Sequence, residues 1–418
     1  MLLAACSEAV VTPEAVQPEV EEVEYKVPMG VMPLAPRFEE ASRTRAWTPP
    51  TGYYFYEAIY DGSFTNGYTL TNKSIDAFFT KEEDREEEPL HGGLVRESDG
   101  TWMFSSKEEV TINKGDYYAY GIIPREAADG ITITRLHPED PDCSYSEGAV
   151  LTIHGLKSVA NDACVMIGAK HGFADKTDPE NIIYYDGDLT TDINGNHIYD
   201  EGDEITNRLR RGDFSFNLGA PISPGATPEN YLFFLFDHLC SALVINMRVD
   251  AEYNTLRTIR LKEVRLQTAS DVAFTKEKRN VVVTLNKTTD GSSPITEIRY
   301  AAPPTDKVGS GVVYRNTEGL TLTTEYSAAS FLTHFLPQDV TNLVVTSKFD
   351  VYDKDTSKNP KGNLVRKDSE ATNTIPLNKI AYFTEAERGK KYTLNMTIQP
   401  TYLYVMSDPD MKFEMVID

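Results

Sequence analysis

Apolar residues after residue 50 fall in short runs separated by turn residues, through almost the whole chain. Between two of these runs, Asn113-Lys114-Gly115-Asp116 has the composition of a tight turn. Short strands at this spacing predict an all-β protein of the antiparallel sandwich class. There is no β-α-β alternation and no GxGxxG motif, so a dinucleotide-binding fold is not expected. The predicted strands are Tyr53–Tyr60, Glu109–Ile112, Tyr117–Ile123, Ile131–Arg135, Val150–Ile153, Cys164–Ile167, Val281–Leu285, Leu320–Thr324, Leu343–Asp353 and Tyr392–Ile398.

Two further segments are predicted to form strands with an irregular feature. Tyr231–Val249 is the most apolar stretch of the chain, and its flanks have the pattern of buried strand, although its length allows a helical turn at Asp237–Ala242. Ile259–Leu266 alternates except for one skipped step at Lys262-Glu263, which predicts a β-bulge there.

A segment rich in proline and glycine, Gly219–Asn230, cannot lie inside a central strand and is the best position for a domain break. We therefore predict three parts. Residues 1–45 form a leader and tether, 46–225 an N-terminal β-sandwich, and 226–418 a C-terminal β-sandwich.

The net charge of the chain excludes some classes of binding partner. The chain has 418 residues, with 41 Lys and Arg against 64 Asp and Glu, for a net charge of −23. Such an acidic surface repels phosphate backbones, so nucleic-acid binding is not expected. Hydrophobic residues make up 40% of the sequence, which is enough for a sizeable core. No stretch approaches the ~20 apolar residues of a membrane-spanning helix.

The first residues have the form of a bacterial lipobox, Leu3-Ala4-Ala5-Cys6, in which acyl chains on Cys6 would hold the protein on a membrane. Only five residues precede Cys6, so we expect either that the true start of the precursor lies upstream or that the chain is trimmed. The alternative is a chance Ala-Ala-Cys. The Glu-, Val- and Pro-rich stretch Ser7–Pro36, which follows at once, is typical of an extended tether and favours the lipoprotein.

Export would place the remaining cysteines, Cys143, Cys164 and Cys240, in an oxidising compartment. A Cys143–Cys164 disulfide would close a loop of 22 residues and stabilise the fold by about 3 kcal/mol if it were unstrained. Cys240 lies in an apolar run and is expected to be a small buried hydrophobe. No cysteine or histidine cluster has the spacing of a zinc motif.

The densest polar constellation is a loop of calcium-binding type. Its oxygen donors fall at loop positions 1, 3, 5, 9 and 12, and position 7 contributes a backbone carbonyl. Two departures are His197 at the sixth position, where glycine is usual, and an aspartate at the twelfth. We expect a structural Ca²⁺, and the alternative is a solvated turn without metal. The predicted ligands are Asp192, Asn194, Asn196, Ile198, Asp200 and Asp203.

No catalytic constellation is visible. The seven histidines form no HExxH or other metal pair, and there is no GxSxG elbow or P-loop. His238 lies inside an apolar run, where a hydrogen-bonded core histidine is expected. We therefore predict that the protein is not an enzyme.

Several of these patterns together resemble the fimbrillin family, the lipoprotein-derived, type V-like pilins of anaerobic Gram-negative bacteria. They are the lipobox with its arginine-containing tether, Phe236-Asp237-His238-Leu239 before an apolar strand, Phe335-Leu336-Pro337-Gln338, and Gly389–Leu394 before Pro400–Val405. The resemblance implies two tandem transthyretin-like antiparallel β-sandwich domains. It also implies a fimbrial subunit, or a relative anchored at the cell surface on the outer membrane.

The resemblance also implies an assembly mechanism. An arginine-specific protease removes the N-terminal segment, including its first strand, and a strand from another subunit fills the vacated groove. Arg37, Arg43 and Arg45 are candidate cleavage sites. We favour Arg45–Ala46, because the tether character ends there; the alternative is that these are ordinary linker charges. Tyr25–Val31 has regular apolar spacing and could fill the groove before cleavage, although Pro28 and Gly30 weaken it as a strand.

The C-terminus offers a candidate donor strand, since Met411, Phe413, Met415 and Ile417 alternate and would share one face. An ordinary edge strand of its own domain explains this pattern equally well. A second functional hypothesis is a surface lipoprotein that binds glycan or another ligand of a host or bacterial surface. A cleft with exposed tyrosine or tryptophan would favour that hypothesis.

Overall fold

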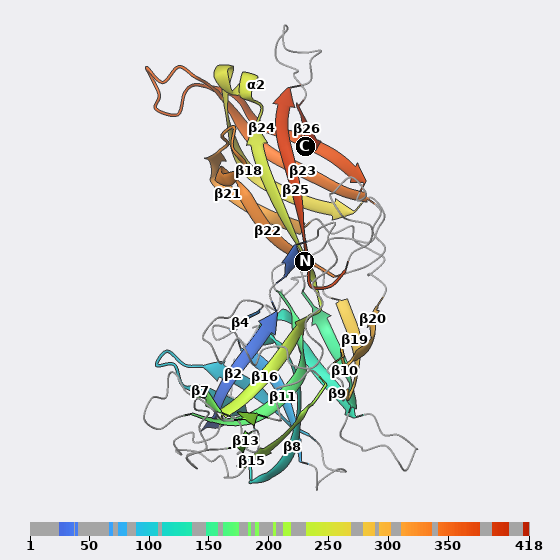
Figure 1. Cartoon of the computed structure of the whole chain (residues 1–418). Coiled ribbons are helices and arrows are strands. Elements are labelled where there is room, and N and C mark those ends of the chain that lie inside the picture. Colours follow the sequence, from blue (N-terminus) through green and yellow to red (C-terminus); the bar gives the residue numbers. More distant parts are fainter. Residues whose placement is uncertain are drawn as a thin grey trace, which may run out of the picture.

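The computed structural model has two β-rich lobes, one above the other in Figure 1, and each lobe contains two packed sheets. Its only helices among the described residues are α2 (Ala251–Leu256) and two single 3₁₀ turns, η1 (Arg125–Ala127) and η2 (Tyr326–Ala328). None of the helices described is long and apolar enough to cross a membrane. The structure describes residues 25–36, 38–40, 67–69, 74–81, 89–107, 111–135, 148–157, 162–174, 183–184, 189–191, 204–205, 212–218, 231–268, 279–288, 292–301, 311–336, 342–376, 387–400 and 413–417.

The first lobe is built on an 11-stranded sheet with the order β1-β7-β6-β5-β8-β11-β16-β2-β4, to which β12 and β15 add at β11 and β8. Its strands are β1 (Tyr25–Pro28), β2 (Gly30–Pro36), β4 (Gly67–Thr69), β5 (Ile75–Lys81), β6 (Leu90–Arg96), β7 (Trp102–Ser106), β8 (Gly115–Ile123), β11 (Cys164–Ala174), β12 (Ile183–Tyr184), β15 (Ser215–Leu218) and β16 (Tyr231–His238).

A four-stranded sheet, in the order β20-β19-β10-β9, covers one face of the large sheet. Alternating apolar residues of the two sheets form the core between them, with Leu151, Val283 and Phe233 fully buried. A second core on the other face of the large sheet contains Phe79, Phe104 and Phe234. The strands of the covering sheet are β9 (Gly130–Arg135), β10 (Gly148–Leu156), β19 (Arg279–Asn286) and β20 (Ile295–Tyr300).

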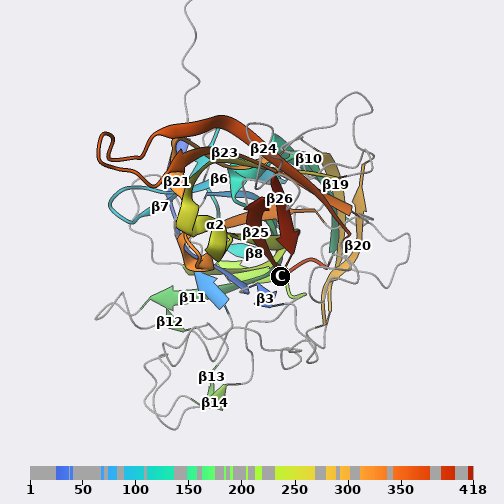
Figure 2. The same ribbon diagram turned by 90° about the horizontal axis from the view of Figure 1, so that it is seen from above.

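The second lobe is a sandwich around one core, which includes Ile245, Phe349 and Met396. One of its sheets has the order β22-β17-β25-β26, with β3 also paired to β25, and the other has the order β21-β18-β23-β24. Figure 2 shows this lobe from above. Its strands are β3 (Glu39–Glu40), β17 (Ser241–Val249), β18 (Arg257–Thr268), β21 (Gly311–Thr321), β22 (Ser330–Phe335), β23 (Asn342–Asp353), β24 (Leu364–Pro376), β25 (Lys390–Pro400) and β26 (Phe413–Ile417).

The chain passes between the lobes in the middle of its most apolar segment. β16 belongs to the first lobe and β17 to the second, and only Leu239 and Cys240 lie between them, in a bend instead of the helical turn that the sequence allows. The chain later returns to the first lobe for the hairpin β19–β20. A boundary at residue 225 therefore does not follow the division between the sheets.

The all-β class is confirmed, but the sheets are not purely antiparallel. β2 runs parallel to β16, and β17 runs parallel to β25. Parallel neighbours need a long connection, and both pairs join strands that are far apart in sequence. The bulge predicted in β18 is confirmed, because its register with both neighbours shifts between Leu261 and Glu263.

Candidate functional site

The N-terminal strands close a gap in the large sheet. β1 pairs antiparallel with β7, and β2 pairs parallel with β16. Between them, the Met29 amide donates a hydrogen bond of 2.9 Å to the Trp102 carbonyl. β7 and β16 lie at opposite ends of the row β7-β6-β5-β8-β11-β16. Because β1 and β2 are continuous in the chain, the segment 25–36, here called the closing strand, joins those ends and turns the row into a ring.

Where its side chains are described, the closing strand is buried on both faces from Val27 to Ala35, whereas Tyr25 and Lys26 are exposed. Val27, Met29, Val31 and Ala35 lie in the core that also contains Phe104 and Phe234. Leu34 points the other way, into the core under the four-stranded sheet, and is 0% exposed. This alternation is the period of two expected of a strand. It confirms that the Tyr25–Val31 region forms strand in the first lobe.

Prolines limit the hydrogen bonding of the closing strand. Pro28 is opposite Met103 on β7, and Pro33 is opposite Phe234 on β16. A proline has no backbone N–H and cannot donate to either ladder, and it is rarely found in central strands. The closing strand is therefore held largely by the burial of its side chains, which contribute about 1.5–3 kcal/mol for each fully buried Val, Leu or Met.

Directly after the closing strand, the chain reaches the second lobe. Phe38 stacks on the ring of His238 with centroids 3.9 Å apart, and β3 pairs parallel with the start of β25. Arg37, Arg43, Arg45 and Ala46 lie outside the described residues, so cleavage at Arg45–Ala46 stays a prediction. Any cut at that bond would separate both the closing strand and β3 from the rest of the chain.

The C-terminal strand β26 forms the edge of the second lobe. It pairs antiparallel with β25, with Phe413 opposite Pro400, Met415 opposite Ile398 and Ile417 opposite Met396. β3 and β26 share one edge of β25, since β17 occupies the other edge. Met411 lies outside the described residues. In this arrangement β26 completes its own sheet, and a donor role would require it to leave an edge where it has a single neighbouring strand.

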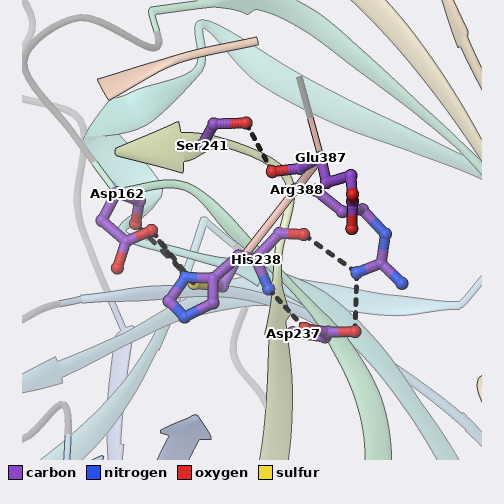
Figure 3. A network of polar contacts seen from close by, with 7 residues as sticks. Asp162, Asp237, His238, Ser241, Glu387 and Arg388 are labelled. Atoms are coloured by element: carbon purple, nitrogen blue, oxygen red, sulfur yellow. Dashed lines mark hydrogen bonds and ion pairs between the residues drawn. The ribbon is translucent and has the colours of Figure 1, made fainter. Parts of the chain in front are cut away.

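A polar network joins the two lobes beside the crossing point (Figure 3). Arg388, just before β25, donates to the Asp237 carboxylate at 2.6 Å and to the His238 carbonyl at 3.1 Å. The Ser241 hydroxyl donates to the Glu387 carbonyl at 2.7 Å. Burial disfavours the charged guanidinium, but nearby groups, led by the Asp237 carboxylate, together outweigh burial and raise the pKa of Arg388 above its usual value.

Replacing Arg388 with methionine is expected to lower the free energy of unfolding by about 1–3 kcal/mol, because the Asp237 carboxylate loses its ion-pair partner in a largely buried place. Denaturant titration measures the change. Arg299→Met is the matched control, since the Arg299–Glu297 pair is mostly exposed and should contribute less than about 1 kcal/mol. Equal effects of the two substitutions would contradict this account of the junction.

The predicted lipidation site and calcium ligands are not among the described residues. Cys6 lies outside them, as do Asp192, Asn194, Asn196, Ile198, Asp200 and Asp203. The strands next to the loop are described: β13 (Leu189–Thr191) pairs antiparallel with β14 (Glu204–Ile205), and Thr191 is opposite Glu204. The twelve residues of the predicted loop, 192–203, are those between the two strands in the sequence.

The predictions for the cysteines and for His238 have different outcomes. Cys164 is buried and belongs to no disulfide among the described residues, and Cys143, its predicted partner, lies outside them. Cys240 is confirmed as a buried residue of the core. His238 is confirmed as a buried, hydrogen-bonded histidine that is 1% exposed. The sequence did not predict that Cys164 and His238 meet, because they are 74 residues apart.

A surface pocket of 390 Å³ lies in the first lobe and is lined by Ser74, Asp76, His91, Arg125, Glu126, Ala128, Asp129 and Gly130. His91 Nε2 is 2.7 Å from the Asp76 carboxylate, and its ring stacks on Phe78. Most of its lining residues are charged or polar, and none is a tyrosine or tryptophan. The aromatic cleft that would favour a glycan-binding protein is therefore not found at this pocket.

No family model and no curated protein matches the chain. Among solved structures it is similar to a candidate cell adhesion protein of Bacteroides fragilis, with 10% identity, a TM-score of 0.38, and coverage of 94% of this chain and 97% of that one. It is also similar to a fimbrial protein of Bacteroides vulgatus, with 13% identity, a TM-score of 0.29 and coverage of 94% and 99%. A C-terminally truncated tip fimbrial protein of Porphyromonas gingivalis has 7% identity, a TM-score of 0.24 and coverage of 94% and 99%.

These neighbours are described as adhesion and fimbrial proteins, the class that the sequence patterns resemble. At these TM-scores the similarity places no individual residue of this chain.

Proposed function

We propose that this chain is a structural and adhesive fimbrial subunit that assembles by strand exchange after N-terminal trimming. In this proposal an arginine-specific protease cuts at Arg45–Ala46 and releases the closing strand. The incoming strand comes from another fimbrial subunit of the same or a different kind, and a surface of the host or of another bacterium is the adhesion target.

One observation carries this proposal. The closing strand joins two edges of the large sheet and is buried at Val27, Met29, Val31, Leu34 and Ala35, yet it precedes the predicted cleavage site. Its loss would leave β7 and β16 with unpaired edges and expose an apolar groove against Phe104 and Phe234. Such a groove offers what β-augmentation needs, which is unpaired strand edges and apolar pockets. In β-augmentation, main-chain hydrogen bonds give affinity and alternate side chains fill pockets.

Protease-coupled assembly tests the proposal. Full-length protein without its lipid is treated with an arginine-specific protease, run unboiled on a denaturing gel, and sequenced from the new N-terminus. We expect a heat-sensitive ladder of oligomers whose subunits begin at Ala46. A chain that is trimmed there but remains monomeric would contradict a polymerising role and leave the ligand-binding surface lipoprotein as the better hypothesis.

Anchoring belongs to the same proposal. Acylation of Cys6 would place the uncut precursor on the outer membrane until the protease separates the tether from the two lobes. The ligand-binding alternative has one structural observation in its favour, the pocket around Asp76 and His91, whose lining residues are mostly charged or polar. Its mixture of carboxylates and one arginine suits a small polar ligand better than stacking of sugar rings.

We also propose that residues 192–203 bind one structural Ca²⁺. The β13–β14 ladder supports this, because it pairs the residues directly before and after a loop of the length and donor spacing that calcium requires. Calcium titration calorimetry of the chelator-treated protein should show one binding event, and Asp192→Asn with Asp200→Asn should abolish it. Binding that is unchanged in this double variant would place calcium elsewhere.

A further inference from the structure

Three side chains of metal-ligating type converge next to the lobe crossing. Within the part of the chain that the structure describes, one such group is found, formed by Asp162, Cys164 and His238. His238 Nδ1 is 2.8 Å from Asp162 Oδ1 and 3.4 Å from Cys164 Sγ, and this sulfur is 3.7 Å from Asp162 Oδ1. All three residues are buried. Figure 3 shows Asp162 beside the ring of His238.

The fold fixes this convergence in the backbone. Cys164 and His238 are direct register partners where β11 meets β16, and Asp162 precedes Cys164 by two residues. Partners in an antiparallel pair have Cβ atoms about 4.5–5.5 Å apart, so both side chains start from rigid, neighbouring positions. The Leu239 amide donates to the Ala163 carbonyl at 2.8 Å and holds the segment between Asp162 and Cys164 against the end of β16.

The chemistry of the three groups suits zinc. Zn²⁺ binds thiolate sulfur, imidazole nitrogen and carboxylate oxygen, and its open sites have three protein ligands with a water in the fourth position. A thiolate and a carboxylate together supply two negative charges, which one divalent cation neutralises in a place where an uncompensated charge would be costly. A carboxylate ligand is a poor match for Cu(I), which prefers soft sulfur ligands.

The distances require only a small adjustment. Bonds of about 2.0–2.3 Å to a tetrahedral zinc ion place the ligand atoms about 3.3–3.8 Å apart. The two separations that involve sulfur are already in this range. The 2.8 Å separation between Nδ1 and Oδ1 is that of a hydrogen bond, and the two atoms would move apart by about half an ångström when the metal replaces the shared proton.

The surroundings would hold and cover the ion. Phe38 stacks on the His238 ring and covers it with an apolar group. Arg388 donates to the His238 carbonyl, and the His238 amide donates to Asp237 Oδ1 at 2.9 Å. These hydrogen bonds fix the backbone of the histidine, as partners outside the ligand set do in known metal sites.

We propose that Asp162, Cys164 and His238 bind one zinc ion at the junction of the lobes. The site does not depend on strand exchange, and it uses none of the residues predicted to bind calcium. Phe38 precedes Arg43 and Arg45, so it belongs to the segment that trimming at Arg45–Ala46 would remove.

Cobalt substitution tests the proposal. The full chain is stripped with a chelator under reducing conditions and titrated with Co²⁺ alone, then with Zn²⁺ in competition. We expect one equivalent of Co²⁺ with a thiolate-to-cobalt charge-transfer band in the near ultraviolet and the visible bands of tetrahedral cobalt, all displaced by one equivalent of Zn²⁺. The absence of a charge-transfer band would overturn the proposal and leave a buried, hydrogen-bonded histidine.

Variants assign the ligands. Cys164→Ser should abolish the charge-transfer band, and His238→Gln and Asp162→Asn should each weaken binding by more than the roughly 10–100-fold that loss of a partner outside the ligand set costs. Cys240→Ser is the matched control, because Cys240 is also a buried cysteine near the crossing but does not belong to the group, and it should bind as the wild type does. A charge-transfer band that persists in Cys164→Ser would overturn the proposal.

A measurement on the wild-type chain tests the zinc site even if the ligand variants fail to fold. Cys164 is alkylated in partly unfolding conditions with and without Zn²⁺, and the modified peptides are quantified by mass spectrometry. Zinc should slow alkylation of Cys164 at least about tenfold more than that of Cys240, since a metal-bound thiolate is not available as a nucleophile. Equal protection of the two cysteines would contradict the site.

Discussion

Replacing Leu34 with aspartate is expected to destabilise the uncut protein by about 4 kcal/mol or more. Leu34 lies in the closing strand with no exposed surface, in the core between the two sheets of the first lobe. The substitution removes the buried apolar side chain and places a carboxylate among the apolar side chains of that core. Denaturant or thermal unfolding of the full-length protein measures the effect.

Two controls make this result specific to the closing strand. Leu332→Asp introduces the same change at a leucine that is 58% exposed, and it should alter stability by less than about 0.5 kcal/mol. After cleavage at Arg45–Ala46 and removal of residues 1–45, the wild-type protein and Leu34→Asp are the same polypeptide, so their stabilities must become equal. If Leu34→Asp leaves the uncut protein as stable as the wild type, the closing strand is not part of the core.

Deleting residues 411–418 is expected to reduce the oligomer ladder at least tenfold after trimming. In a strand-exchange polymer each subunit needs both a vacated groove and a strand to donate, and this deletion removes the donor while leaving the groove. β26 is an edge strand of five residues that pairs with β25 alone, so we expect the other strands of the second lobe to stay paired without it. Unboiled gels and light scattering of the trimmed protein measure assembly.

A peptide control separates loss of the donor from loss of the fold. A synthetic peptide of residues 409–418, added to trimmed wild-type protein, should occupy grooves without extending the polymer and therefore shorten the ladder. The deletion variant should have the same far-ultraviolet circular dichroism as the wild type. A ladder of normal length from the deletion variant would show that another segment is the donor.

The local pattern of apolar and polar residues predicted strands and a bulge correctly where the burial of alternate side chains determines the backbone conformation. The alternation at Val27, Met29 and Val31 indicated a strand in spite of Pro28, and the skipped step in Ile259–Leu266 indicated the bulge at Leu261–Glu263. In both cases the side chains that face a core fix the period of the backbone.

Local pattern did not show which sheet each strand joins. β16 and β17 have nearly the same apolar character, yet they belong to different lobes, and a bend of two residues between them carries no proline or glycine signal. The prolines and glycines of Gly219–Asn230 are a stronger turn signal, so the domain boundary was predicted there and not at Leu239–Cys240, where the chain passes between the lobes. The parallel pairs and the meeting of Cys164 with His238 depend on register between distant strands, which no short window of sequence contains.

Hydrogen exchange tests the central claim most directly, namely that the closing strand occupies a groove between β7 and β16 and can be removed from it. The chain lacking residues 411–418 is measured by mass spectrometry before and after cleavage with an arginine-specific protease. We expect exchange in β7 and β16 to become at least about tenfold faster after cleavage, and exchange in β23 of the second lobe to stay the same. A peptide of residues 24–37 should restore the protection. Unchanged protection of both β7 and β16 after the cut would contradict the account.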